Sequence, residues 1–210
     1  AQVLNRLTYI SAISHLRRVS TPIDKSGKLT DPRKLDPSSW GYICPAETPE
    51  GQPVGVVKNL SYMTCVTGYS VSNSLEDYIA PYIIPFSDNP IDIIDKTKVF
   101  INGRWIGVSD SPLELYNSLK QKKYQGIIHV YTSIIFDVND NEIYVCNVSG
   151  RLVRPILLVD NNKLRLTKNH IMRLNSGELN WIDLFTNTKT ETAVMEYIDP
   201  DEQNKSFISM

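Results

Sequence analysis

Two carboxylates three residues apart are the first candidates for chemistry in this chain of 210 residues. Glu47 and Glu50 lie in the stretch from Trp40 to Leu60, which also holds three prolines and three glycines. Paired carboxylates can serve as general acid and general base. Proline fixes φ and glycine permits positive φ, however, so this composition predicts a stiff, specially shaped loop. No further catalytic group lies close in sequence, and we expect no catalytic residue here.

Basic side chains form the second candidate group, because phosphates attract Lys and Arg regardless of sequence. Residues 1–65 hold eight Lys and Arg against five Asp and Glu, whereas residues 66–210 hold fourteen against eighteen. This imbalance indicates a polyanionic partner for the first third of the chain, although ordinary charge scatter is an alternative. Arg17 and Arg18 follow a segment with helical periodicity. They could clamp a phosphate, but composition alone favours the more common role of complementing the dipole at the end of a helix.

Neither a metal site nor a cofactor site is expected. The three cysteines are far apart and form no Cys-x-x-Cys pair, and the three histidines are scattered. This pattern argues against zinc and against a disulfide framework, and it is typical of a reducing, intracellular compartment. No phosphate-binding glycine loop and no apolar run of eighteen residues are present, so we expect no bound nucleotide cofactor and no membrane partner.

The elements that position these residues can be predicted from periodicity. Apolar side chains at positions 3, 7, 10, 13 and 16 predict a helix over residues 2–18. Residues 19–39 are polar and proline-containing, which predicts a long loop. A strand is expected at Val56–Val66, and residues 68–98 read as an irregular connector with a possible apolar turn at Tyr78–Ile84.

The second half of the chain predicts a hairpin, a helix and further strands. Asn102-Gly103 between β-forming residues favours a type I′ turn. A helix should follow, with Ser111 as N-cap and Pro112 at its first position. Leu113, Tyr116 and Leu119 are expected to share the apolar face of this helix. Lys120, Lys122 and Lys123 indicate its C-terminal end.

Strands are then expected at Ile134–Val138, Glu142–Cys146 and Thr192–Asp199, before an acidic tail. Core candidates near the end are Trp181, Leu184 and Phe185. No internal repeat is present. The predicted class is α+β, built from small modules that are joined by irregular segments.

Several blocks in residues 1–65 resemble a known family. They are Val3-Leu4-Asn5-Arg6, Ser14-His15-Leu16-Arg17-Arg18, Thr21-Pro22-Ile23, Gly27-Lys28-Leu29, Trp40-Gly41, Cys44–Gly51 and Gly55–Leu60. In this order they are similar to the fork region of the second-largest subunit of multisubunit DNA-directed RNA polymerases. This is the eukaryotic, archaeal and large-DNA-virus counterpart of the bacterial beta subunit.

Later blocks extend the resemblance over nearly the whole chain. Val99–Val108 is similar to the first external domain of that family, and Gly150–Pro155 and Glu196–Asp199 are similar to the second. The resemblance implies a fork at residues 1–65, with one long helix and loops. It also implies two small mixed external domains with antiparallel strands, at residues 66–147 and 148–210.

The resemblance also implies roles for individual residues. The loop from about Asp24 to Asp31 is similar to the fork loop that keeps the two DNA strands apart, and it holds Lys25 and Lys28. Gln2, Arg17 and Arg18 match positions near the RNA–DNA hybrid. Arg33 and Glu50 match positions close to the incoming nucleotide, Glu50 through an ion pair with an arginine elsewhere in the subunit.

The implied function is part of a nucleotidyltransferase that synthesises RNA on a DNA template. The catalytic Mg²⁺ would be held mainly by the largest subunit, so this segment should bind no metal and should not polymerise alone. Implied partners are the largest and other polymerase subunits, template DNA and the RNA–DNA hybrid. In an alternative reading, residues 66–210 form a protein-interaction platform for polymerase partners.

Some residues depart from the commoner nuclear form of this family and bear on the type of organism from which the chain comes. Asp24-Lys25-Ser26 is less basic than the commoner nuclear form of the fork loop, and the gap between Cys65 and Leu75 is short. The chain is also rich in Ile, Asn, Lys and Tyr, the residues of AT-rich codons. These departures favour a large DNA virus or an AT-rich protist. The expected location is the nucleus for a cellular enzyme, and host cytoplasm or virion for a viral one.

Overall fold

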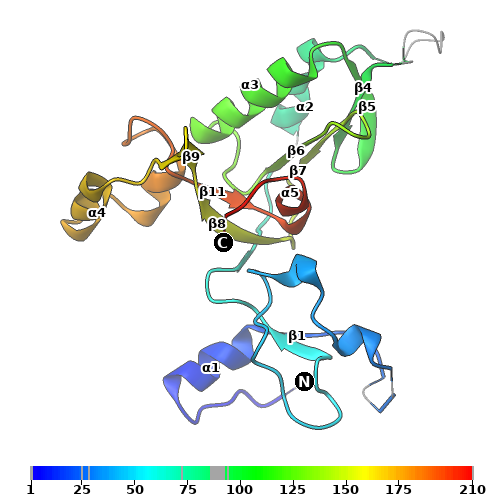
Figure 1. Cartoon of the computed structure of the whole chain (residues 1–210), viewed down its shortest axis with the longest axis vertical. Helices are drawn as coiled ribbons and strands as arrows, with labels where there is room; N and C mark the ends of the chain where they lie inside the picture. Colours follow the sequence, from blue (N-terminus) through cyan, green and yellow to red (C-terminus); the bar gives the residue numbers. More distant parts are fainter. Residues whose placement is uncertain are drawn as a thin grey trace. The chain divides into compact units, whose positions relative to one another are not determined.

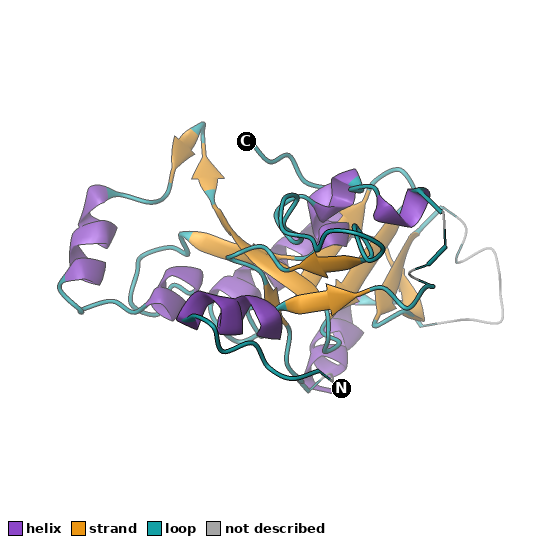
Figure 2. Cartoon of the chain, turned by 90° about the horizontal axis from the view of Figure 1, so that it is seen from below, coloured by secondary structure: helices purple, strands orange, loops and turns teal. Residues whose placement is uncertain are grey.

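The computed structural model describes residues 2–24, 26, 27, 29–71, 73–85, 93 and 95–209. The chain separates into two compact units, residues 1–65 and residues 66–210. Short helices, strands and long loops occur in both (Figures 1 and 2). The predicted α+β class is therefore confirmed. Within the described ranges, no helix is long and apolar enough to cross a membrane.

Helix α1 (Tyr9–Leu16) of the first unit is shorter than the helix predicted over residues 2–18. It begins with a capping box, in which the Thr8 hydroxyl accepts from Ser11 N and the Ser11 hydroxyl accepts from Thr8 N. The carboxamide oxygen of Asn5 accepts a main-chain N–H and the Ser11 hydroxyl. These local bonds compete with helix formation before Thr8, so the prediction is wrong for that part.

The rest of the first unit is built on a short antiparallel ladder. Strand β1 (Arg18–Ser20) pairs with β2 (Val57–Asn59), with Val19 opposite Lys58. Two 3₁₀ turns, η1 (Asp31–Arg33) and η2 (Pro37–Ser39), lie between them. The strand predicted at residues 56–66 is thus interrupted, and only its two ends are strands.

The core of the first unit is small. Tyr42 and Val56 are its largest fully buried side chains. Helix α1 buries none of its residues, and Tyr9, Ile10 and Leu16 on it are strongly exposed. This helix therefore presents an apolar surface, which soluble proteins rarely leave uncovered.

The second unit contains a four-stranded sheet with the order β5-β4-β7-β6. Its strands are β4 (Thr97–Ile101), β5 (Arg104–Ser109), β6 (Ser133–Asp137) and β7 (Glu142–Cys146). Asn102 and Gly103 have φ values of 51° and 81°, which a type I′ turn requires, so the predicted hairpin is confirmed. Strand β7 runs parallel to β4, and the sheet is mixed rather than purely antiparallel.

Helix α3 (Pro112–Tyr124) packs beside β6, and α2 (Asn73–Ile79) with η3 (Ala80–Tyr82) lies in the predicted connector (Figure 1). Leu115 and Leu119 of α3 are fully buried, since residues four apart share a helix face. Leu113 is 62% exposed, so its predicted place in the core is wrong. The buried cluster consists of Leu75, Ile79, Val99, Ile101, Leu115, Leu119, Ile128, Ile134, Ile143 and Val145.

A three-stranded sheet with the order β11-β8-β3 completes the second unit. Its strands are β3 (Cys65–Val66), β8 (Leu152–Leu157) and β11 (Met195–Ile198). The other elements are the hairpin strands β9 (Val159–Asp160) and β10 (Lys163–Leu164), then α4 (Lys168–Asn175), η5 (Trp181–Phe185) and α5 (Pro200–Asn204). Leu184 and Phe185 are buried as predicted, but Trp181 is 45% exposed. The predicted acidic tail contains α5.

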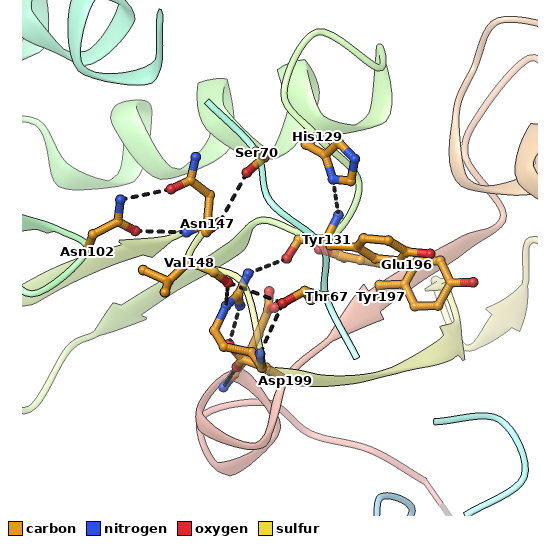
Figure 3. A network of polar contacts seen from close by, with 12 residues as sticks. Thr67, Ser70, Asn102, His129, Tyr131, Asn147, Val148, Glu196, Tyr197 and Asp199 are labelled. Atoms are coloured by element: carbon orange, nitrogen blue, oxygen red, sulfur yellow. Dashed lines mark hydrogen bonds and ion pairs between the residues drawn. The ribbon is translucent and has the colours of Figure 1, made fainter. Parts of the chain in front are cut away.

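Arg151 joins several segments of the second unit. Its Nη1 donates to Asp199 Oδ2 at 2.7 Å and its Nη2 to the Tyr131 carbonyl at 2.7 Å. Its Nε donates to the Val148 carbonyl at 2.9 Å, and its main chain is hydrogen-bonded to Thr67. Figure 3 shows this network around the labelled Thr67, Tyr131, Val148 and Asp199. Residues on both sides of the boundary predicted near 148 thus contact one another, and the external-domain boundaries stay predictions.

Candidate nucleic-acid interface

Arg17 binds the main chain of its own unit. Its Nη2 donates to the Ser61 carbonyl at 2.6 Å and to the Thr64 carbonyl at 2.8 Å. In return, Leu60 N donates to the Arg17 carbonyl at 3.0 Å. Arg17 therefore fastens the end of α1 to the segment that follows β2. Because carbonyl groups carry no net charge, the guanidinium keeps its attraction for phosphate.

Arg33 is held in the same way but by more groups. Its guanidinium donates to four main-chain carbonyls, those of Gly27, Leu29, Gln52 and Val54, at distances of 2.5 to 3.0 Å. Since a guanidinium has five N–H donors, most of its hydrogen-bonding capacity is used inside the unit. The side chain thereby joins the segment before η1 to the stretch from Trp40 to Leu60.

That stretch carries its own polar framework. The Thr48 hydroxyl donates to the Val57 carbonyl at 2.9 Å and accepts from Gly55 N at 2.8 Å. Cys44 N donates to the Asn59 carbonyl at 2.8 Å. Each bond joins residues at least seven apart, so the loop is closed on itself as its proline and glycine content predicts.

The two carboxylates of the loop have different surroundings. Glu47 accepts the Ser14 hydroxyl and so connects the loop to α1. Glu50 is exposed, and no ion pair or hydrogen bond of its side chain is found among the described residues. They are not arranged as a catalytic pair. The expected arginine partner of Glu50 lies outside this chain, and that ion pair stays a prediction.

Arg18 and Gln2 are the exposed members of the predicted set. All of β1 is exposed, and the Arg18 guanidinium forms no hydrogen bond or ion pair within the part of the chain that the structure describes. Gln2 Oε1 lies 2.9 Å from His15 Nε2. Because His15 Nδ1 accepts from Asn5 N, its Nε2 carries the proton and donates to Gln2. Lys25 and Lys28 lie outside the described residues.

The predicted fork loop begins with an Asp-x-Ser turn. Asp24 Oδ1 accepts from Ser26 N at 2.9 Å and from the Ser26 hydroxyl at 2.7 Å. These two bonds, the hydroxyl first, lower the pKa of the Asp24 carboxyl. Asp36 and Ser38 form the same turn further on, and the pKa of Asp36 is lowered for the same reason. Both carboxylates are therefore ionised at neutral pH and stabilise their turns by accepting hydrogen bonds.

The described residues form no candidate metal site and no disulfide. No group of three or more His, Cys, Asp or Glu side chains is placed to hold a metal ion there. Cys44, Cys65 and Cys146 are free. What the arrangement offers is a positively charged, largely pre-shaped surface, which is suited to sequence-independent contact with phosphates.

Sequence patterns gave no sign that Arg17 and Arg33 would bind carbonyls, because most of the partners, those at Gln52, Val54, Ser61 and Thr64, are distant in sequence. The single available signal was Gly55, since a glycine before a strand marks a close backbone approach. A cluster of buried charges in the second unit, around Lys123 and Glu196, was also missed. Lys123 appeared only as one of three lysines at a helix end.

Comparison with known proteins gives two family-model matches. Residues 2–66 match the model described as RNA polymerase Rpb2, domain 3, and residues 99–160 match RNA polymerase Rpb2, domain 4. The chain is 41% identical to the DNA-directed RNA polymerase II subunit RPB2 of Encephalitozoon cuniculi over 214 residues. It is 38% identical to RNA polymerase II subunit 2 of Arabidopsis thaliana, and 34% identical to RNA polymerase III subunit RPC2 of Drosophila melanogaster.

Each of these three alignments covers 99% or 100% of this chain but 18% of the relative. The chain therefore spans about a fifth of the length of the relatives that it matches. These relatives come from cellular eukaryotes, so the expectation of a large DNA virus is not supported.

Proposed function

This chain belongs to the Rpb2 family, the second-largest subunits of multisubunit RNA polymerases, and we propose that it forms the fork and external part of such a subunit. The observation that carries the proposal is the similarity over the whole chain, at 41% identity, to an RNA polymerase II subunit. The activity is then DNA-directed synthesis of RNA by the assembled enzyme, a nucleotidyl transfer.

Within that enzyme, residues 1–65 line the active-centre cleft near the RNA–DNA hybrid and the downstream edge of the bubble. The first unit supports this role with a positive net charge and an exposed Arg18 on β1. Arg18, Gln2, Lys25 and Lys28 contact the backbone of the nucleic acid. A polymerase must hold every sequence equally, and contacts to phosphate carry no sequence information.

Arg17 and Arg33 act mainly as positioning residues in this proposal. Their side chains bind main-chain carbonyls, and their charges add to the field around the loop. Glu50 is exposed beside the positive-φ residue Gly51. It lies close to the incoming nucleotide, where its charge orients a cation from elsewhere in the subunit, and that cation offsets the repulsion between Glu50 and the triphosphate.

The chemical step is assigned to other parts of the enzyme. Catalytic Mg²⁺ would be held mainly by the largest subunit. The residues of this chain would bind, orient and separate nucleic-acid strands rather than react with them. Partners are accordingly the largest and other polymerase subunits, template DNA and the hybrid. The proposed location is the nucleus, because the relatives are eukaryotic RNA polymerase II subunits.

A second role is proposed for the second unit, as a surface for polymerase partners. Tyr69, Val71 and Ile127 are strongly exposed and line one shared cavity of about 330 Å³. The unit carries more acidic than basic residues, which disfavours binding to phosphate. Protein partners suit this surface better than nucleic acid.

Salt-dependent binding of an RNA–DNA hybrid tests the division of roles. The whole chain should bind the hybrid with an affinity that falls as salt rises, and Arg18→Ala should reduce that salt slope by about one phosphate contact. Tyr69→Ala should leave both affinity and slope unchanged. Hybrid binding that depends on Tyr69 and not on Arg18 would overturn the assignment.

A further inference from the structure

Four charged side chains meet where α3, β11 and α5 pack together in the second unit. Lys120 Nζ lies 2.5 Å from both Glu196 Oε1 and Glu202 Oε1, and Lys123 Nζ lies 2.8 Å from Glu196 Oε1. Lys123 and Glu202 are only 2% and 3% exposed. Charges this deep in a protein are stable only when each one is paired.

The two carboxylates are not equally well partnered. Glu196 is bound by Lys120, by Lys123 and, through Oε2, by the Tyr124 hydroxyl at 2.9 Å. Glu202 has the ammonium of Lys120 at Oε1 only. Its Oε2 is buried without a hydrogen-bond partner in the part of the chain that the structure describes. An ionised carboxylate oxygen left in this way is costly.

The environment of Oε2 limits what could satisfy it. A cavity of about 460 Å³ borders the cluster and is lined by Tyr116, Lys120 and Glu202 among others. The Oε2 atom itself, however, has almost no surface open to water. A water molecule or ligand in the cavity therefore does not reach it, whereas a proton does.

We propose that Glu202 is a proton-dependent latch that fastens α5 to α3. With a proton on Glu202, the two carboxylates no longer compete for Lys120, and the helix docks without an ionised Oε2 that lacks a hydrogen-bond partner. When Glu202 ionises, it shares the ammonium of Lys120 with Glu196, and its Oε2 becomes a buried anionic oxygen without a hydrogen-bond partner among the described residues, so docking of α5 weakens.

Titratable and charged groups lie on α5 and on the elements near it. They are Tyr116, Lys120, Lys123 and Tyr124 from α3, Glu196 from β11, Arg154 from β8, Asp137 from β6, and Asp199, Asp201 and Lys205 around α5 itself. Burial raises the pKa of the Glu202 carboxyl. The charges of Lys123 and Lys120 lower this pKa, and the charge of Glu196 raises it again. The net direction is upward.

The sign of the pH effect follows from that direction. A carboxyl whose pKa is raised by folding stabilises the folded form below its ordinary value of 4.5. That contribution is lost as pH rises through the raised pKa. Docking of α5 should therefore be strongest in mild acid and should weaken toward higher pH.

Hydrogen exchange of the α5 amides tests the latch in the whole chain. Gln203 N, which donates to the Asp199 carbonyl, reports docking directly. Relative to the intrinsic exchange rate, wild-type protection should fall as pH rises above the ordinary Glu value of 4.5, by roughly tenfold per unit of pKa difference. Glu202→Gln, which copies the neutral side chain, should give protection that does not change with pH.

Asp201→Asn is the matched control, because Asp201 is an exposed carboxyl of the same helix. It should keep the wild-type pH dependence. Carbon-13 titration of the Glu202 carboxyl in the unmutated chain provides a reading that needs no variant, and it should give a pKa above 4.5. A Glu202 titration at or below 4.5, or a Glu202→Gln chain with the wild-type slope, would overturn the proposal.

Discussion

Arg33 and Gly55 approach each other so closely that a Cβ on residue 55 would lie 2.3 Å from the Arg33 carbonyl oxygen and 2.7 Å from its Cα. Gly55 also has a φ of +70°. The guanidinium of the same arginine binds the carbonyls of Gln52 and Val54, just before this glycine. One arginine therefore holds the loop through both its main chain and its side chain.

Gly55→Ala should destabilise the chain by about 2 kcal/mol or more, because it adds both positive-φ strain and a clash with backbone that cannot move aside. Urea unfolding of the chain measures this. Gly51→Ala is the control, since Gly51 has a φ of +85° but open space where a Cβ would be. It should cost only about 1 kcal/mol. Equal losses in the two variants would contradict the close approach.

Arg33→Lys should also destabilise the first unit, by about 1 to 3 kcal/mol, because an ammonium cannot reproduce four hydrogen bonds in a planar fork. The melting temperature of the chain is the measurement. The neighbouring Lys34 forms only an exposed pair with Asp31, so Lys34→Ala should change stability by less than about 0.5 kcal/mol. An Arg33→Lys chain with the melting temperature of wild type would show that the positive charge, and not the planar guanidinium geometry, holds the loop.

Local patterns predicted several parts of the fold because their causes are local. The Asn102-Gly103 turn and the helix after Ser111 depend on residues adjacent in sequence, and both are present. The helix over residues 2–18 failed because the periodicity did not reveal the capping box at Thr8. The apolar face predicted for the later helix included the exposed Leu113 and left out the buried Leu115, because packing against the sheet decides which side of the helix is buried.

The candidate site was less predictable than the fold. The sequence pointed to basic side chains, but it could not tell Arg18, which is exposed, from Arg17, which binds distant carbonyls. The buried lysines of α3 were equally hidden, because their carboxylate partners lie more than seventy residues away. Contacts of that range depend on topology, which local propensity does not contain.

Lys123→Met should destabilise the second unit by about 3 kcal/mol or more, because it leaves Glu196 buried with one ammonium fewer. Methionine keeps most of the side-chain volume, so the loss reports charge pairing and not a cavity. Chemical denaturation gives the value. Lys122→Met on the same helix is the control and should lie within about 0.5 kcal/mol of wild type. Similar losses in both variants would refute the importance of the cluster.

Acid should weaken the second unit through Glu196. Burial would raise its pKa, but Lys123 and Lys120 outweigh burial and lower the pKa of Glu196 to about 2. A lowered pKa stabilises the folded form above the ordinary value of 4.5, and that stability is lost as pH falls toward 2. The contribution at neutral pH is about 3 kcal/mol.

Glu196→Gln should therefore be much less stable than wild type at pH 7 and nearly equal to it near pH 2, as measured by urea unfolding at each pH. Glu178→Gln, which alters an exposed pair with Arg173, should show almost no difference at either pH. A Glu196→Gln penalty that does not change with pH would mean that packing, and not ionisation, causes it.

The central claim is that the first unit contacts the nucleic-acid backbone inside an RNA polymerase. The direct test is transcript elongation by the purified, assembled enzyme carrying Arg18→Ala or Lys122→Ala in this subunit, measured over a range of salt concentrations. Arg18→Ala should slow elongation and lower the slope of the salt dependence by about 0.7 to 0.9, as expected for one phosphate contact. Lys122→Ala should match wild type. Equal effects of the two substitutions, or no effect of Arg18→Ala at any salt concentration, would contradict the claim.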